Sequence, residues 1–276
     1  MSNQVYSNIT DKRVDQTLVL FDHDGTTCLT NENAYDSIKF GLLEAAKQLD
    51  LDPAPLEDKW DKFFSSTTGT TELYGCKVTL DIIGNYTTSL EEFARLHFLG
   101  RANWYKNMKS YSTYIYDTYY PDAESLIYYC WKTPNIHIGL VTGNPSATIK
   151  ERLATHLGEI FFKPNNINSF GDEALSREEL IKLSIEKATK NIPNFEPKIE
   201  NNCITNVIYI GDSKADLYAG LSARVKTIWV PSRSLQAAKA AMSDDTMVLL
   251  KKLIPDNILI TNNLENQEVT DFIAKK

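Results

Sequence analysis

Short apolar runs that end at polar or charged residues are the feature that most constrains how this chain can fold. Residues 17–21, 136–141, 206–210 and 226–230 are such runs, and residues 258–260 form a fifth near the carboxyl end. They are rich in β-branched side chains and bounded by Gly, Asp or Pro, which favours buried strands over helix segments. Amphipathic stretches separate them. This alternation predicts an α/β fold with a mostly parallel sheet covered by helices on both faces.

Local signals predict where several of the intervening helices begin. Asn144 is expected to be an N-cap with Pro145 at the first helical position, and Gly158 is expected to close that helix. Residues 176–179 have the pattern of a capping box, and residues 213–216 resemble another.

Residues 31–118 interrupt the alternation of strands and helices. Helical patterns cover residues 34–49 and 90–109, strand-like runs are few, and aromatic side chains are frequent. We therefore expect a mainly helical cap domain at 31–118, inserted into a core domain made of residues 1–30 and 119–276.

Composition excludes several function classes. The chain has 276 residues and a net charge of −7, which argues against broad binding to nucleic acid or to anionic membranes. No apolar run approaches the roughly 20 residues that span a bilayer, and the amino terminus does not have the pattern of a signal peptide. The four cysteines lie far apart without metal-ligand spacing, which fits a reducing compartment. We expect a soluble, cytoplasmic protein.

The pentapeptide 22–26, Asp-His-Asp-Gly-Thr, is the most informative segment. Asp22 and Asp24 follow a predicted buried strand and need not share one role, since one carboxylate could attack a phosphorus atom while the other handles a proton. Gly25 permits a sharp turn that brings the main chain close to a ligand. A polar turn held by side-chain hydrogen bonds is the alternative that this segment alone leaves open.

Two further strand ends carry polar residues. Thr142 is followed by Gly143 and Asn144, and a hydroxyl beside backbone N–H groups at a helix start is a good phosphate contact. Asp212 follows the third run, with Asp216 four residues on, and such oxygen ligands suit Mg²⁺. Structural roles stay open here, because Thr often closes a strand and Asp216 also completes a helix-capping pattern. We expect these groups to meet at the carboxyl ends of the parallel strands.

These three elements, in this order, resemble the haloacid dehalogenase (HAD) superfamily of phosphohydrolases. The resemblance covers roughly residues 14–30 and 119–276. Residues 120–126, 207–220 and 226–230 look like the phosphoglycolate-phosphatase-like branch. The resemblance implies a HAD-like Rossmannoid core with a parallel sheet and an inserted helical cap.

The resemblance also implies a role for each carboxylate. Asp22 would be the nucleophile that forms an aspartyl-phosphate, and Asp24 the general acid and then the general base. Mg²⁺ would be held by the carboxylates of Asp22 and Asp212 and by the main-chain carbonyl of Asp24, with Asp216 supporting.

The family expects a basic residue between its second and last motifs, and the sequence offers more than one. Arg177 is favoured because it opens a capped helix, Lys163 is the runner-up, and Lys182 is third. An arginine could bridge nucleophile and phosphoryl oxygens bidentately. The alternative is that Arg177 is only a solvated side chain. Arg177 would join Thr142 and the segment 143–144 in binding the phosphoryl group.

The function implied is a Mg²⁺-dependent phosphatase that hydrolyses a phosphate monoester through an aspartyl-phosphate. Its partner would be a small soluble metabolite such as phosphoglycolate or a sugar phosphate, with no nucleic acid or membrane partner. A phosphoglucomutase-type phosphotransferase shares the motifs, and a non-catalytic phosphate-binding protein would keep the fold. Intact Asp22, Asp24 and Asp212 favour an enzyme, but fold and motif do not name the substrate.

Overall fold

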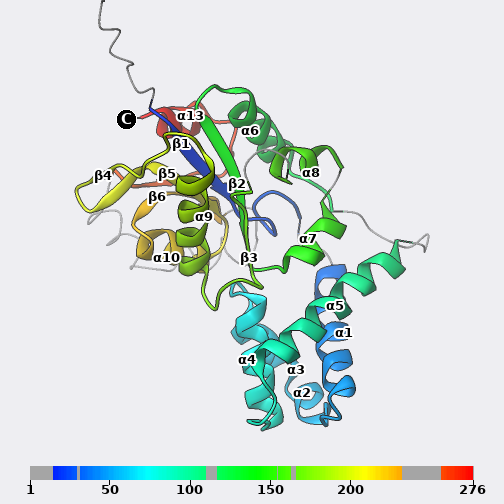
Figure 1. Ribbon diagram of the computed structural model, residues 1–276. Helices are drawn as coiled ribbons and strands as arrows, with labels where there is room; N and C mark the ends of the chain where they lie inside the picture. Colours follow the sequence, from blue (N-terminus) through cyan, green and yellow to red (C-terminus); the bar gives the residue numbers. More distant parts are fainter. Residues whose placement is uncertain are drawn as a thin grey trace, which may run out of the picture.

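The computed structural model of the protein describes residues 15–29, 32–109, 117–153, 155–162, 166–231 and 256–275. Their strands form one sheet in the order β3-β2-β1-β5-β6-β7, and β4 pairs with β5 off this path (Figure 1). The strands are β1 (Thr17–Phe21), β2 (Ile136–Thr142), β3 (Ser169–Phe170), β4 (Ile199–Glu200), β5 (Cys203–Gly211), β6 (Val225–Trp229) and β7 (Ile258–Ile260). All neighbours on the path are parallel and only β4 is antiparallel, so the predicted α/β fold with a parallel sheet is confirmed.

The helices fall into an insertion and a set that covers the sheet. The insertion contains α1 (Glu32–Gln48), α2 (Ala54–Asp58), α3 (Trp60–Thr67), α4 (Glu72–Ile83) and α5 (Leu90–Met108). The remaining helices are α6 (Pro121–Lys132), α7 (Ser146–Arg152), α8 (Thr155–Phe162), α9 (Arg177–Asn191), α10 (Lys214–Ser222) and α13 (Gln267–Ala274).

Strand β1 lies inside the sheet, between β2 and β5, and is buried on both faces. Val19 and Phe21 belong to a hydrophobic cluster that includes α6, α8 and α13, whereas Leu18 and Leu20 pack in a second cluster with α9 and α10. Successive side chains of a strand point to opposite faces, so both faces here are apolar. This explains why the run 17–21 shows no polar alternation.

The predicted start and end of the helix after β2 are wrong. Pro145 is the N-cap of α7, which begins at Ser146. The Asn144 amide instead donates to Asp24, and Asp172 accepts hydrogen bonds from the backbone and hydroxyl of Ser146. The helix ends at Arg152, and Gly158, expected as its terminator, lies inside α8. The capping boxes that open α9 and α10 are confirmed.

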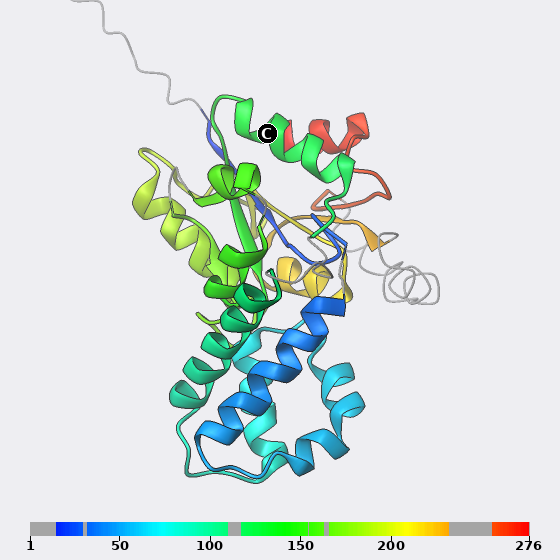
Figure 2. The ribbon, with the colours of Figure 1, turned by 90° about the vertical axis from the view of Figure 1, so that its right-hand side faces the viewer.

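The insertion between β1 and β2 is helical, as expected, and has its own hydrophobic core. Leu42, Phe63, Leu80 and Phe93 are among the residues buried there. Helices α1 and α5 lie side by side along its length (Figures 1 and 2). Within the described part of the chain, no helix is both long and apolar enough to cross a membrane.

Candidate active site

The segment after β1 turns sharply beneath the end of β5. The backbone N–H of Asp22 donates to the carbonyl of Ile210 at 2.9 Å, so the first aspartate continues the pairing of β1 with β5. Gly25 has a φ of +83°, and a Cβ there would lie 2.4 Å from Oδ2 of Asp212. Only glycine accommodates both the left-handed backbone and this close approach, so the turn brings Asp22 beside Asp212.

Three aspartates form a buried cluster at the carboxyl ends of β1 and β5. Carboxylate oxygens of Asp22, Asp212 and Asp216 all lie within 4.8 Å of one another. Asp216 is fixed as the N3 residue of α10, where it accepts hydrogen bonds from the backbone and hydroxyl of Ser213. The structure therefore brings together the three carboxylates that the sequence predicted at two separate strand ends.

Arg177 lies at the same cluster. Its Nη1 donates to Oδ1 of Asp22 and to Oδ1 of Asp216, each at 2.6 Å, and its Nε donates to the carbonyl of Gly69 at 2.7 Å. The capping box of α9 directs this first helical residue toward the sheet edge. Lys182 instead pairs with Glu178 on an exposed face, and Lys163 lies outside the described residues.

The electrostatics of the cluster fit a divalent cation. Burial, together with the charge of Asp216, raises the pKa of both Asp22 and Asp212 although Arg177 opposes the change. Three carboxylates surround one guanidinium, so the fully ionised cluster has two negative charges in excess. Buried charges require partners, and hard carboxylate oxygens are the ligands that Mg²⁺ prefers. The residues present therefore fit this ion.

Asp24 points to a different set of partners. Arg152 donates to both of its oxygens, from Nη1 at 3.0 Å and from Nη2 at 2.5 Å, and the Asn144 amide donates at 2.6 Å. Burial alone would raise the pKa of Asp24, but the Arg152 guanidinium holds it well below its usual range. Arg152 also contacts Asp117, where the chain returns from the insertion. In this arrangement Asp24 is a carboxylate with a fixed orientation.

Arg152 and Asp117 were not predicted from the sequence. Arg152 ends the run Lys-Glu-Arg on a short amphipathic helix, a pattern typical of solvated side chains. The arginine is nevertheless fully buried. Only its position in the folded protein identifies it.

A second cluster of possible metal ligands lies behind Asp24. Ligand atoms of His23, Cys28 and Asp117 are within 4.8 Å of one another. Arg152 donates to both oxygens of Asp117, and His23 also contacts the Thr27 hydroxyl at 3.0 Å. Since the one carboxylate here is already paired with a guanidinium, hydrogen bonding explains the cluster without an ion.

The segment Thr142–Asn144 follows β2 at the same edge of the sheet. Thr142 is buried, and its hydroxyl accepts hydrogen bonds from the backbone N–H and the amide of Asn144, at 3.2 and 3.0 Å. Through that amide the segment reaches Asp24. The segment predicted to bind phosphate thus contacts Asp24 of the first motif.

The insertion contacts this segment directly. A Cβ on Gly143 would lie 2.2 Å from the carbonyl oxygen of Thr70, and the Gly143 carbonyl accepts a hydrogen bond from the backbone of Glu72 at 2.9 Å. Glu72 in turn binds Arg101 and His97 of α5. These three residues were not predicted, because each occupies an ordinary position on a helix of the insertion.

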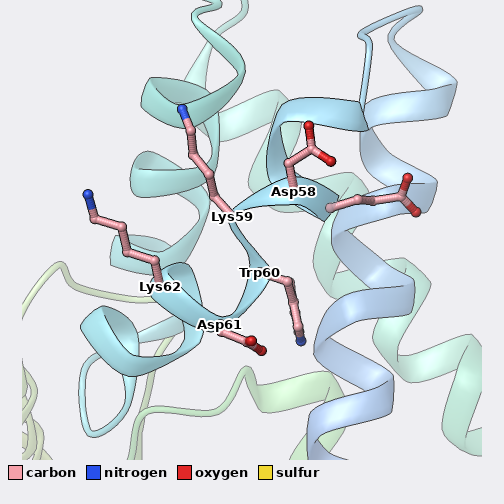
Figure 3. Close-up of a pocket in the computed structure, with 6 residues that line it drawn as sticks. Asp58, Lys59, Trp60, Asp61 and Lys62 are labelled. Atoms are coloured by element: carbon pink, nitrogen blue, oxygen red, sulfur yellow. The ribbon is translucent and has the colours of Figure 1, made fainter.

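A hollow on the insertion lies elsewhere. It is lined by residues 57–62, around the junction of α2 and α3, with charged side chains that point outward (Figure 3). None of the residues near Asp22 lines it. We therefore assign the chemistry to the sheet edge.

Comparisons with known proteins identify a family of hydrolases and similar folds. A profile described as haloacid dehalogenase-like hydrolase matches residues 16–224. A search of curated proteins by sequence finds no match. The β-phosphoglucomutase of Clostridium difficile is similar in structure over 94% of this chain and 98% of its own, with a TM-score of 0.56 and 18% identity. CbbY of Rhodobacter sphaeroides, solved with xylulose-(1,5)bisphosphate, covers 91% of this chain and 96% of its own, with a TM-score of 0.52 and 13% identity. At these identities the likeness concerns the fold.

Proposed function

Because the chain belongs to the haloacid dehalogenase-like hydrolase family, we propose that it is a Mg²⁺-dependent phosphatase that acts on a small phosphate monoester. The observation that carries this proposal is the meeting of Asp22, Asp212, Asp216 and Arg177 at one buried sheet edge. Phosphoryl transfer needs mainly positioning and charge stabilisation, and this cluster supplies both.

The proposed first step is attack by Asp22 on the phosphorus atom. A bond forms between Oδ of Asp22 and phosphorus, the ester bond breaks, and Asp24 in its protonated form gives its proton to the leaving oxygen. Water then attacks the aspartyl-phosphate, its proton passes to Asp24, and inorganic phosphate and free Asp22 result. Asp24 must leave its pairing with Arg152, at least in part, to take up a proton during this cycle.

The remaining groups would bind and orient the phosphoryl group. Arg177 and the Thr142 hydroxyl would donate hydrogen bonds to its oxygens, together with the backbone of residues 143–144. The carboxylates of Asp22 and Asp212 and the carbonyl of Asp24 would hold Mg²⁺, supported by Asp216 through its position in α10. When bound, the ion neutralises charge on the phosphoryl oxygens.

We also propose the division into a core, residues 1–30 and 119–276, and a cap, residues 31–118. Contacts of residues 69–72 with Arg177 and Gly143 support a cap that excludes water from the reaction. The substrate would be a soluble metabolite such as phosphoglycolate or a sugar phosphate. The four cysteines are buried and form no disulfides, which supports a reducing compartment such as the cytoplasm.

The test is phosphate release from a panel of phosphomonoesters, measured with Mg²⁺ or with EDTA. We expect Mg²⁺-dependent release, lowered by about 10³-fold or more in Asp22→Asn because the nucleophile is lost. Asp58→Asn, at an exposed position of the insertion, is the matched control and should keep wild-type activity.

Two outcomes would contradict the phosphatase proposal. Full activity of Asp22→Asn would show that Asp22 is not the nucleophile. Absence of phosphate release from every ester by the wild type would show that the protein does not catalyse this reaction. A parallel assay with added sugar phosphate acceptors separates a transferase from a hydrolase, since a transferase moves labelled phosphate to the acceptor instead of releasing it.

A further inference from the structure

The start of helix α4 is fixed against the segment that follows β2. The backbone N–H of Glu72 donates to the carbonyl of Gly143, and that of Leu73 donates to the carbonyl of Gly171, both at 2.9 Å. These bonds hold Glu72 at the boundary between insertion and core, beside the segment 142–144. No loop separates the residue from the site.

The carboxylate of Glu72 is held in one orientation by two buried groups. Nη1 of Arg101 donates to Oε1 at 2.5 Å, and Nε2 of His97 lies 2.6 Å from Oε2. The side chains of Arg101 and His97 are fully buried, whereas that of Glu72 is 12% exposed. Among the described residues, Nδ1 of His97 has no hydrogen-bond partner, so the ring contacts Glu72 through Nε2 alone. Glu72 is therefore an ionised acceptor, positioned by its neighbours, with part of its surface open.

This carboxylate is linked to Asp24 through a short chain of hydrogen bonds. Nη2 of Arg101 donates to Oδ1 of Asn144 at 3.3 Å, and the amide of the same Asn144 donates to Asp24 at 2.6 Å. Glu72 is thus on the side of Asp22 that Asp24 occupies. Under the proposed function this is the side of the leaving group.

In the part of the chain that the structure describes, the arginines on this side are already paired with carboxylates. Arg101 binds Glu72, Arg152 binds Asp24 and Asp117, and Arg177 binds Asp22 and Asp216. A substrate with a second anionic group would approach the carboxylate of Glu72, and Arg101 could not bind that group because it is already paired with Glu72. A hydroxyl on the leaving group would instead donate to a free lone pair of Glu72.

We propose that Glu72 is a specificity-determining residue that selects phosphate esters whose leaving group carries hydroxyl groups and disfavours those that carry a second anionic group. This inference rests on the proposed phosphatase function. Of the two substrate types considered above, it favours sugar or polyol phosphates over phosphoglycolate.

The experiment compares two probes of the same carbon skeleton, glycerol phosphate and phosphoglycerate. The first has a neutral alcohol where the second has a carboxylate. We expect the wild type to prefer glycerol phosphate by about tenfold or more in kcat/KM, since a hydrogen bond to a charged group discriminates on this scale. In Glu72→Gln the preference should fall by about 10-fold, mainly through a higher KM for glycerol phosphate.

The ratio of the two kcat/KM values is the decisive quantity, because the fraction of folded enzyme cancels within one preparation. This matters because Glu72→Gln leaves Arg101 buried without its anion. Glu72→Asp keeps the charge with a shorter reach and should retain a preference between those of the wild type and Glu72→Gln. Glu91→Gln, at an exposed position in the first turn of α5, should leave the ratio unchanged.

Failure of this inference is distinct from failure of the phosphatase proposal. Hydrolysis with a preference for phosphoglycerate or phosphoglycolate, or an unchanged ratio in Glu72→Gln, would overturn the role of Glu72 while the reaction stands. Absence of hydrolysis of every ester by the wild type would overturn both.

Discussion

At the scale of single residues, the site is organised by buried guanidinium groups. Arg152 and Arg177 are each bound to two carboxylates, and neither has the exposed position that arginines usually take. Breaking such a buried pair is costly because the remaining charge has no solvent to replace its partner. Arg152 in particular ties the first motif to the residue where the chain returns from the insertion.

We expect Arg152→Met to destabilise the protein by about 3–5 kcal/mol, because Asp24 and Asp117 would stay buried without a cation. The measurement is the free energy of unfolding from urea titration at neutral pH. Lys182→Met is the control, since its pair with Glu178 is exposed and its loss should cost less than about 1 kcal/mol. Equal effects of the two substitutions would show that the buried pairs contribute little.

The ion pair between Arg152 and Asp117 makes the stability difference between wild type and Arg152→Met depend on pH. Burial alone would raise the pKa of Asp117, but Arg152 holds it below its ordinary value of about 3.9. A carboxyl with a lowered pKa in the folded state stabilises above its unfolded pKa, and this contribution is lost as pH falls through the folded pKa. Without Arg152, burial raises the pKa of Asp117 in the variant, so the variant takes up a proton and loses part of its penalty as the pH falls. The gap between wild type and Arg152→Met should thus be largest near pH 8 and shrink steadily toward low pH.

Some single residues of the site could not be predicted from the sequence. Asp22, Asp24 and Asp212 follow apolar strands, and a carboxylate directly after a buried strand has few structural explanations, so these residues were found. Arg152 and Glu72 lie on helices, where charged side chains are normally solvated. Which helical charges are buried depends on how the insertion packs on the core, and no local pattern encodes that.

At the scale of elements, buried strands were the easiest to predict and polar short strands the hardest. β1 has the predicted bounds because its apolar run is buried, and β7 has them although only Ile258 of its three residues is buried. The hairpin of β4 and β5 was missed because the burial of β4 is low, although Asn201 and Asn202 at its turn, both with positive φ, are typical of a two-residue hairpin.

Two glycines with opposite surroundings test how closely the segments that follow β2 and β3 are packed. A Cβ on Gly171 would lie 1.6 Å from the carbonyl oxygen of Gly143, whereas a Cβ on Gly158, inside α8, would meet nothing within 4 Å. We expect Gly171→Ala to destabilise by about 1–3 kcal/mol through forced backbone movement. Gly158→Ala should stabilise by about 0.5–1 kcal/mol, because alanine favours a helix interior.

The measurement for this glycine pair is again urea unfolding, combined with the KM of the preferred substrate. Gly171→Ala should raise KM, because α4 begins at the affected contact, and Gly158→Ala should leave it unchanged. If Gly171→Ala were as harmless as Gly158→Ala, the close contact between Gly171 and the carbonyl of Gly143 would be wrong.

At the scale of the whole molecule, one sheet edge receives residues from distant parts of the chain. β1, β5 and α9 supply Asp22, Asp212 and Arg177, while the insertion supplies Gly69 and Glu72. Parallel strands bring their carboxyl ends together, which predicted Asp22 and Asp212, whereas Arg177 was favoured among several basic residues because of the resemblance to the family. The order of motifs could not predict the second group, because the insertion folds around its own core and its orientation is set by side-chain packing alone.

From the excess negative charge at this edge we predict that a bound cation stabilises the whole protein. We expect Mg²⁺ to raise the free energy of unfolding by about 2.7 kcal/mol when its concentration is 100-fold above its dissociation constant, because it binds only the folded state. Asp212→Asn should abolish this gain, and in EDTA it should be more stable than wild type, because burial and the charge of Asp216 both oppose ionisation of Asp212.

Thermal unfolding with EDTA and with Mg²⁺ measures both effects, and Asp58→Asn should behave as wild type. The two curves of Asp212→Asn should then coincide above the wild-type curve in EDTA. A Mg²⁺ gain in Asp212→Asn equal to that of the wild type would instead show that the stabilising ion binds elsewhere, and the assignment of this carboxylate cluster to the metal would be wrong.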